Sequence, residues 1–431
     1  MYTLEEYISN LLNTLTDTKD NITIIRRHSR KLEQLGDISF PLDIKNWYHL
    51  IDRHCVDNNV VNIFQYKVVG NGDISSYIRE LKRKCKDFHM DIQDIIVKGN
   101  DVHIYLNRST LLYRSTITDV LTKCGSYGSC NIFNTRIDVE CDCNTMEKSL
   151  FELDLSTLRL LELKDVALNF LDFTTEKGES NNTSFEVIFT SNSSRKCKNA
   201  KPILCGPVLN EKGVKEVNIT MQQLCDKRTI DMRLMAQHRY KVQVIPNTPR
   251  EDYFLKIVKK LGRSCVTIEM LSNKPNKPVK VSLMDLRTAN KGAAFIFYNC
   301  ARISVLLNEF EKRVSKGIYP NLPDVDKIDF STLNQPEEWE LFYVYVLQFP
   351  MVIKSCVKDI LKGIFNPQYL ITFLSNFSSL YSAYYRRVRI LIDPREHLFM
   401  VLYARIYLLK ALQVVFHNAL FLLNIEPIKE M

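Results

Sequence analysis

The sequence has few of the residues and segments that mark fibrous, disordered or secreted proteins. It holds only 13 glycines and 14 prolines in 431 residues, too few for a collagenous or low-complexity chain. Its first residues include Glu5 and Glu6 and lack the basic and then apolar parts of a secretory signal peptide. Its 12 cysteines follow no regular spacing, which excludes a disulfide miniprotein. Reduced thiols and a cytoplasmic location are therefore expected.

The common motifs of catalytic and metal sites are also missing. The sequence contains no glycine-rich phosphate loop of either nucleotide-binding type and no His-Glu-x-x-His zinc motif. Four cysteines could be drawn as a zinc site, but their spacing is not that of the Cys-x-x-Cys pairs of zinc knuckles: Cys124, Cys130, Cys141 and Cys143. We therefore predict no cofactor, no metal site and no catalytic residue.

The longest apolar tract, residues 397–425, does not have the pattern of a membrane span. Arg405 and Lys410 interrupt it, and its uncharged part from Ala411 to Ile425 is shorter than the roughly 20 residues that cross a bilayer. We predict a buried helix here and no association with membranes.

Positive charge is concentrated in one segment. The chain has 58 Lys and Arg against 49 Asp and Glu, a net charge of +9. Residues 227–263 contain ten Lys and Arg and three acids, a local charge of +7. Such a segment is either a solvated face or a phosphate-binding face, and its charge alone favours neither. Three of its lysines are the candidate phosphate contacts: Lys256, Lys259 and Lys260.

The length predicts two or three domains, and the sequence pattern divides the chain into three segments. Residues 1–125 mix helices with short strands, which indicates a small α+β domain. Residues 126–284 contain extended runs at 132–139 and 185–189, which indicates a mixed α/β region. Residues 285–431 have helical periodicity, which predicts an all-α bundle. The expected fold class is α+β.

Local signals place several elements. In the first segment Tyr77 and Leu81 lie on the apolar side of a basic amphipathic helix. Apolar runs at 95–97 and 102–106 flank Gly99-Asn100-Asp101. These three residues are typical of the turn of a β-hairpin. Cap and proline residues predict four helix starts, at Ser109-Thr110, Asn334-Gln335-Pro336, Asn366-Pro367 and Asp393-Pro394.

The end of the chain resembles a known family. Residues 418–425 read Asn-Ala-Leu-Phe-Leu-Leu-Asn-Ile, and Glu-Pro-Ile-Lys-Glu and a terminal Met431 follow. This is similar to the end of arginyl-tRNA synthetases, whose anticodon-binding helical bundle, the DALR domain, finishes in an apolar helix, a turn, a Pro and a terminal Met. Residues 295–303 (FIFYNCARI) and 377–388 (FSSLYSAYYRRV) resemble two further helices of that bundle. The resemblance covers about residues 291–431.

The catalytic signatures of that family are absent. A class I synthetase binds ATP with a HIGH-type signature and a KMSKS-type loop, and the nearest fragment, Lys280-Val281-Ser282, lacks the second Lys. The N-terminal region is similar to the synthetase domain that contacts the tRNA elbow, but residues 100–104, Asn-Asp-Val-His-Ile, replace its Gly-Phe-Ile-Asn-Phe pattern.

A chain of this kind resembles the DALR anticodon-binding domain-containing protein 3 family. The resemblance implies a non-catalytic adaptor that recognises arginine tRNAs and supports 3-methylcytidine formation in the anticodon loop by a partner methyltransferase.

The resemblance also implies which bundle residues contact tRNA. Splayed bases of an RNA loop stack on aromatic rings and guanidinium planes. The implied contacts are Phe295, Tyr298, Arg302, Tyr385, Arg386, Arg387, Arg389 and Met431. For an arbitrary helix the same aromatic residues would be core residues. A helical scaffold that binds only protein and a divergent active arginyl-tRNA synthetase are the other interpretations.

Overall fold

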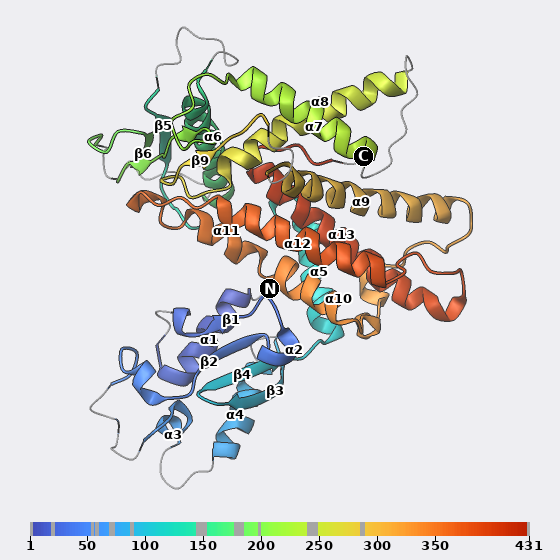
Figure 1. The fold of residues 1–431 in the computed structure, drawn as a ribbon. Coiled ribbons are helices and arrows are strands. Elements are labelled where there is room, and N and C mark those ends of the chain that lie inside the picture. The colour runs from blue at the N-terminus through green and yellow to red at the C-terminus, as the bar shows by residue number, and fades with distance from the viewer. Residues whose placement is uncertain are drawn as a thin grey trace. The chain divides into compact units, whose positions relative to one another are not determined.

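The computed structural model describes residues 3–18, 22–52, 56, 60–68, 74–86, 90–143, 153–175, 185–196, 200–238, 249–284 and 289–428. The chain forms two compact units, each assembled from separate segments of the sequence. The first consists of Met1–Thr122, Leu322–Gln348 and Asp393–Leu408, and the second of Lys123–Asn321, Phe349–Ile392 and Leu409–Met431. The C-terminal helices thus contribute to both units. The predicted α+β fold class is confirmed (Figure 1).

The first unit is built on an antiparallel sheet with the strand order β1-β2-β4-β3. Its strands are β1 (Arg26–Arg27), β2 (Ile38–Pro41), β3 (Ile92–Lys98) and β4 (Asp101–Leu106). The predicted hairpin is confirmed, because Lys98 pairs with Asp101 across the turn Gly99-Asn100 and Gly99 has a φ of 60°. Its helices are α1 (Leu4–Thr16), α2 (Leu32–Leu35), α3 (Ile63–Lys67), α4 (Ile74–Lys86) and α5 (Thr110–Lys123). The predicted amphipathic helix is α4, which buries Tyr77 and Leu81.

A later segment of the chain packs against this sheet. Helix α10 (Pro336–Glu340) begins at the predicted Pro336, and Gln335 N donates to Glu338 at 3.0 Å as in a capping box. A π-helical segment, Leu341–Leu347, follows and is wholly buried. Trp339 Nε1 donates to a carboxylate oxygen of Asp37 at 2.8 Å. Burial raises the pKa of Asp37, and this bond and one from the Leu106 amide partly offset the rise.

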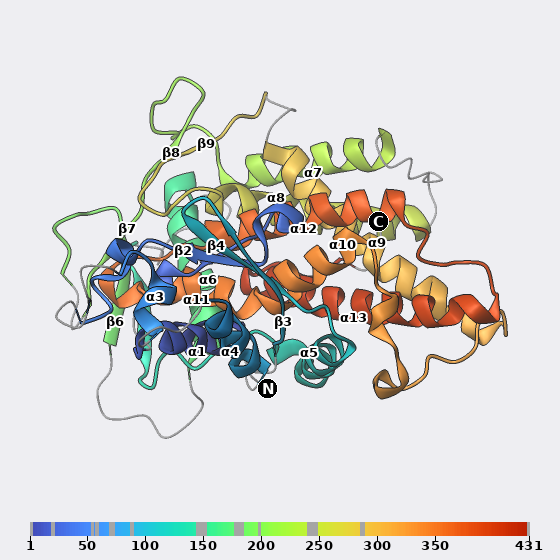
Figure 2. The same ribbon diagram turned by 90° about the horizontal axis from the view of Figure 1, so that it is seen from below.

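The second unit contains a parallel sheet with the order β5-β6-β7. Strands β5 (Ile137–Cys141) and β6 (Phe185–Thr190) are joined by α6 (Leu155–Thr174), and β7 is Ile203–Leu204. The predicted run 185–189 is confirmed, whereas the strand predicted from residue 132 begins at Ile137, because the Ile132 amide bonds instead to Thr174 O. Two short strands, β8 (Val208–Leu209) and β9 (Val279–Lys280), form a parallel pair. Between them in the sequence lie two antiparallel helices, α7 (Met221–His238) and α8 (Pro249–Leu271), which are seen in Figures 1 and 2.

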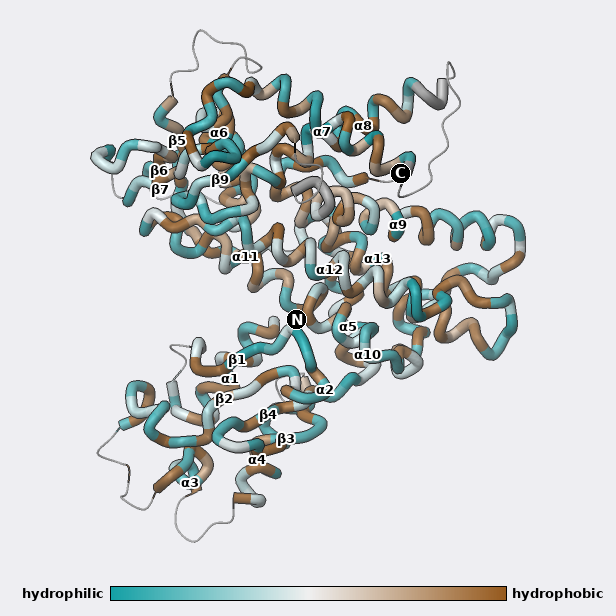
Figure 3. Tube along the Cα trace, viewed as in Figure 1, coloured by the Kyte–Doolittle hydropathy of each residue, from teal (hydrophilic) through white to brown (hydrophobic). Residues whose placement is uncertain are grey.

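The remaining long helices are α9 (Ala289–Ser315), α11 (Phe349–Val357), α12 (Gln368–Arg387) and α13 (Phe399–Leu422). In the second unit α9 packs against α8 and α12, and α11 packs against α12. The C-terminal end of α9 is hydrophilic in Figure 3, and Lys312 there is exposed.

Two of the three helix starts predicted near prolines of the last segment are confirmed. Besides α10, helix α12 begins immediately after Asn366-Pro367, and Tyr369 N bonds to Asn366 O at 3.1 Å. The third is wrong by several residues, because α13 begins at Phe399 after a 3-10 turn, Glu396–Leu398. Residues 393–397 are all exposed, so no buried apolar face supports a regular helix there.

Helix α13 and the preceding turn form the predicted buried helix. By length and composition alone the stretch Glu396–Leu422 would suffice to cross a membrane, but 61% of its apolar window is buried inside the structure. Leu402, Ile406, Leu409 and Leu412 are all at most 1% exposed, as expected for a core helix.

Candidate nucleic-acid interface

Three of the implied tRNA contacts meet between α9 and α12. The guanidinium carbon of Arg302 lies 4.2 Å from the ring centre of Tyr298, one turn earlier on α9. It lies 4.3 Å from the ring centre of Tyr385 on α12. Both distances are well inside the range of cation–π interactions. Arg302 is therefore held between two tyrosine rings, an arrangement called the Arg302 stack below.

The Arg302 stack opens to the surface on the α12 side. Tyr385 is 39% exposed, whereas Tyr298 and Arg302 are half-buried. One Nη of Arg302 is 3.4 Å from Asn299 Oδ1, which orients the guanidinium. The N–H groups of the guanidinium that do not bond to Asn299 are donors for a ligand.

Three more of the implied residues follow Tyr385 at the end of α12. Arg386, Arg387 and Arg389 are all exposed. The negative end of a helix dipole is a favourable place for cations, so this positive charge costs little. Phe295, in contrast, is half-buried on α9 and does not belong to the stack. Met431 lies outside the described residues, which end at Ile428.

Sequence reasoning missed Tyr381, which lies one turn before Tyr385. Its ring centre is 6.4 Å from that of Tyr385, and its side chain is fully buried. Burial raises the pKa of Tyr381, which the nearby Arg302 partly offsets. Its hydroxyl has no hydrogen-bond partner among the described residues. The core interpretation of these aromatic residues thus holds for Tyr381 but not for Tyr385.

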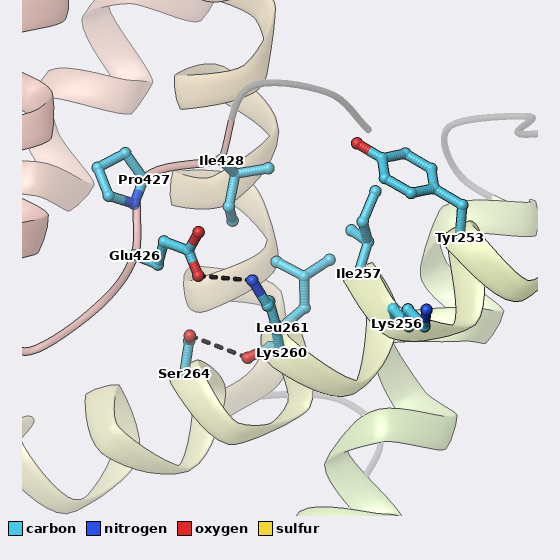
Figure 4. Close-up of a pocket in the computed structure, with 9 residues that line it drawn as sticks. All are labelled: Tyr253, Lys256, Ile257, Lys260, Leu261, Ser264, Glu426, Pro427 and Ile428. Carbon is cyan, nitrogen blue, oxygen red and sulfur yellow. Dashed lines mark hydrogen bonds and ion pairs between the residues drawn. The ribbon is translucent and has the colours of Figure 1, made fainter.

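The exposed face of α8 carries the candidate phosphate contacts. Lys256, Lys259 and Lys260 are all exposed. Beside them a pocket of about 310 Å³ lies between α8 and the C-terminal segment 426–428 (Figure 4). Lys260 Nζ pairs with Glu426 at 2.7 Å across this pocket, and both side chains are largely exposed.

The pocket combines an apolar floor with a polar rim. Ile257, Leu261 and Ile428 line it, and Tyr253, which is 56% exposed, stands at its edge (Figure 4). On its other side the backbone of Ile428 is in hydrogen-bond contact with the Cys300 thiol of α9. The C-terminal segment is therefore held between α8 and α9.

The basic segment presents less surface charge than its sequence indicates. Arg228 is only 1% exposed and forms an ion pair with Glu269 at 2.9 Å. Lys227 pairs with the buried Asp231, and Arg263 pairs with Glu162. Arg228 links α7 to α8 and Arg263 links α8 to α6, whereas the Lys227 pair lies within α7. The local charge of +7 therefore overstates the charge available to bind phosphate, because these three cations are paired with acids.

A second, more polar cavity of about 710 Å³ lies at the carboxyl ends of β5 and β6, beside the start of α6. In parallel α/β sheets this is where helix N-termini bind phosphates. Here the carboxylate of Asp154 accepts from the amides of Ser156 and Thr157, at 3.0 and 3.2 Å. Burial alone would raise the pKa of Asp154, but bonds from Thr157 and Ser156 and the charge of Lys215 outweigh it and lower the pKa. An ionised carboxylate therefore occupies the anion position.

We expect Asp154→Ala to destabilise the second unit by about 1 kcal/mol, the usual cost of losing an N-cap. Asp154→Asn is the matched control and should retain most of the stability, since its amide oxygen still caps the helix. The pKa of Asp154 is lower in the folded protein than in the unfolded chain. The ionised carboxylate therefore stabilises the fold at any pH above its unfolded pKa, and this stabilisation is lost as the pH falls through its folded pKa. Urea unfolding of the three proteins at neutral pH measures the effect, and equal midpoints for Asp154→Ala and the parent would refute it.

None of the four cysteines considered for zinc binding is part of a disulfide. Cys141 and Cys143 are adjacent, with 2.9 Å between their sulfurs. Within the described ranges, no group of three or more His, Cys, Asp or Glu side chains has the geometry to hold a metal ion.

Comparisons with known proteins agree with this geometry. Residues 296–431 match the family described as DALR anticodon binding domain. The chain is 29% identical over 239 residues to DALR anticodon-binding domain-containing protein 3 of Danio rerio, covering 53% of this chain and 41% of that protein. It is 34% identical over 176 residues to the Rattus norvegicus protein of the same name, covering 40% of this chain and 33% of that protein. The matches thus span between a third and two fifths of the curated relatives.

Two solved structures share the fold along nearly the whole chain. The arginyl-tRNA synthetase of Thermus thermophilus has a TM-score of 0.58 at 10% sequence identity and covers 99% of each chain. The arginyl-tRNA synthetase of Plasmodium falciparum has a TM-score of 0.61 at 11% identity, with 99% of this chain and 98% of that chain covered. At such low identity the likeness establishes the fold alone.

Proposed function

Because residues 296–431 belong to the DALR anticodon binding domain family and the chain has the fold of arginyl-tRNA synthetases, we propose that it is a non-catalytic tRNA-binding adaptor. It recognises arginine tRNAs in the cytoplasm through their anticodon loops.

The observation that carries this proposal is the Arg302 stack with its exposed tyrosine. A splayed base stacks on the outer side of Tyr385, and the in-plane donors of Arg302 reach acceptors on a base edge. Lys256 and Lys259 stand on α8, which packs against α9, so phosphate contacts and base contacts come from neighbouring helices. Backbone contacts of this kind position an RNA, while base contacts discriminate among sequences.

The capped start of α6 supports the non-catalytic part of the proposal. An ATP phosphate at this helix N-terminus would have to displace the Asp154 carboxylate or lie beside it. We therefore expect no ATP–pyrophosphate exchange with arginine, with or without tRNA. Exchange above buffer background would contradict this and favour the divergent synthetase.

We further propose that the adaptor brings arginine tRNAs to a methyltransferase that forms 3-methylcytidine in the anticodon loop. This partner is what the family resemblance in the sequence implies. The test adds the purified chain to the methyltransferase and measures 3-methylcytidine in purified tRNAs. We expect the modification to increase in arginine tRNAs and not in unrelated tRNAs. An equal increase in both, or in neither, would contradict the proposal.

A scaffold that binds only protein is the alternative function. Salt dependence of tRNA binding separates the two, because neutralised phosphates release counterions and make affinity fall steeply with salt. We expect saturable tRNA binding to the full chain that weakens with added salt. A protein-only scaffold would show no saturable binding at any salt concentration.

A further inference from the structure

Two thiols at the end of β5 lie close enough to react with each other. The sulfurs of Cys141 and Cys143 are 2.9 Å apart, and both residues are half-buried free thiols. A disulfide bond is about 2.05 Å long, so a shift of roughly 0.9 Å brings the two sulfurs to bonding distance.

The backbone holds these thiols on one side of a fixed segment. Cys141 pairs with Phe189 in the parallel register of β5 and β6. The amide of Asp142, the residue between the two cysteines, donates to Phe189 O at 2.9 Å. Its carboxylate accepts from Thr190 Oγ1 at 3.0 Å. Because alternate residues of an extended segment share a face, this anchoring of Asp142 keeps both sulfurs together.

Cys143 is the thiol that a reagent reaches first. It lines the cavity of about 710 Å³ beside α6, whereas Cys141 does not line this cavity. Burial and the neighbouring Cys143 thiol raise the pKa of Cys141 to about 12, so Cys141 is a poor initial nucleophile. Cys205 lines the same cavity, but it is 8% exposed and its sulfur lies 3.8 Å from Ile203 O.

We propose that Cys141 and Cys143 form a dithiol modification site that closes to an intrachain disulfide by exchange with a low-molecular-mass disulfide such as oxidised glutathione. The Cys143 thiolate attacks one sulfur of the reagent, the reagent's S–S bond breaks, and one thiolate leaves and takes up a proton. Cys141 then loses its proton to solvent and attacks the Cys143 sulfur of the mixed disulfide, which expels the second thiolate. The protein is oxidised by two electrons, and one disulfide is reduced to two thiols.

The test is thiol mapping of the full chain after equilibration with mixtures of reduced and oxidised glutathione. Free thiols are blocked with a maleimide before digestion with trypsin. Arg136 and Lys148 bracket a single peptide that contains both cysteines. In the oxidised protein we expect this peptide to carry no maleimide and to have a mass two hydrogens below that of the dithiol peptide. After reduction, both thiols should react again. Cys124, an exposed cysteine, is the internal control and should only form a mixed disulfide.

Two variants separate the steps. Cys141→Ser should trap glutathione on Cys143, and Cys143→Ser should leave Cys141 unoxidised at the glutathione ratios at which the parent forms the disulfide. Cys205→Ser should still form the disulfide, and circular dichroism checks that each variant is folded. The proposal is overturned if the parent peptide carries two maleimides at every ratio that modifies Cys124. Two glutathiones on one peptide, or a bond from Cys143 to Cys205, would overturn it as well.

Discussion

Tyr385→Ala is expected to weaken binding of arginine tRNA by about ten- to a hundredfold. Stacking of one base on an aromatic ring contributes roughly 1–3 kcal/mol, and Tyr385 is the most exposed ring of the Arg302 stack. The change also removes one of the two rings that contact Arg302. Equilibrium binding of arginine tRNA and of an unrelated tRNA measures the effect, and the unrelated tRNA should lose much less affinity.

The chain offers matched controls for this variant. Tyr385→Phe keeps the ring and should bind nearly as well as the parent. Tyr369, also on α12, is 42% exposed and lies about 24 Å away along the helix. Tyr369→Ala should therefore leave the affinity unchanged. If it and Tyr385→Ala cause equal losses, or if Tyr385→Ala weakens both tRNAs equally, discrimination does not reside in the Arg302 stack.

Reversal of two lysines on α8 is expected to have the second large effect. Lys256→Glu with Lys259→Glu should weaken the binding of every tRNA about equally and flatten the salt slope by about one unit for each lost phosphate contact. Lys212 and Lys280 are exposed elsewhere in the second unit, and their reversal changes the net charge identically. A flattened slope for the α8 pair alone identifies a phosphate-binding face. Equal slopes for both pairs would mean that the α8 lysines are only solvated.

Lys260 is best tested separately from these two lysines. Its ammonium pairs with Glu426, so Lys260→Glu places two carboxylates beside the pocket at the C-terminal segment. The pair itself is exposed and contributes little to stability. Any change in affinity of this variant would therefore report on the C-terminal segment as well as on phosphate contact.

The sequence correctly predicted those elements whose formation depends on neighbouring residues of the chain. The hairpin at Gly99-Asn100, the capped start of α10 and the start of α12 after Pro367 depend on residues adjacent in sequence, and they form where predicted. The start of α13 was mispredicted, because Asp393-Pro394 has the right chemistry but its neighbours have no buried face. A cap signal by itself does not supply the packing that stabilises a helix.

The residues of the candidate site could be predicted from the sequence, but the contacts between them could not. The resemblance to a synthetase bundle drew attention to Tyr298, Arg302 and Tyr385, but the 4.3 Å contact between α9 and α12 depends on tertiary packing. Arg228 pairs with Glu269, 41 positions away, and Arg263 pairs with Glu162, 101 positions away. The net charge of a sequence segment does not show such pairs, so both cations were counted as surface charge.

The most direct test of the central claim is a transplant of the anticodon loop. The loop of an arginine tRNA is placed in an unrelated tRNA, and its equilibrium affinity for the full chain is measured at one salt concentration, together with the reciprocal exchange. If the C-terminal bundle reads the anticodon loop, the transplant should bind like the arginine tRNA, and Tyr385→Ala should abolish the gain. Affinity that stays with the body of the tRNA, whichever loop it carries, would contradict the account.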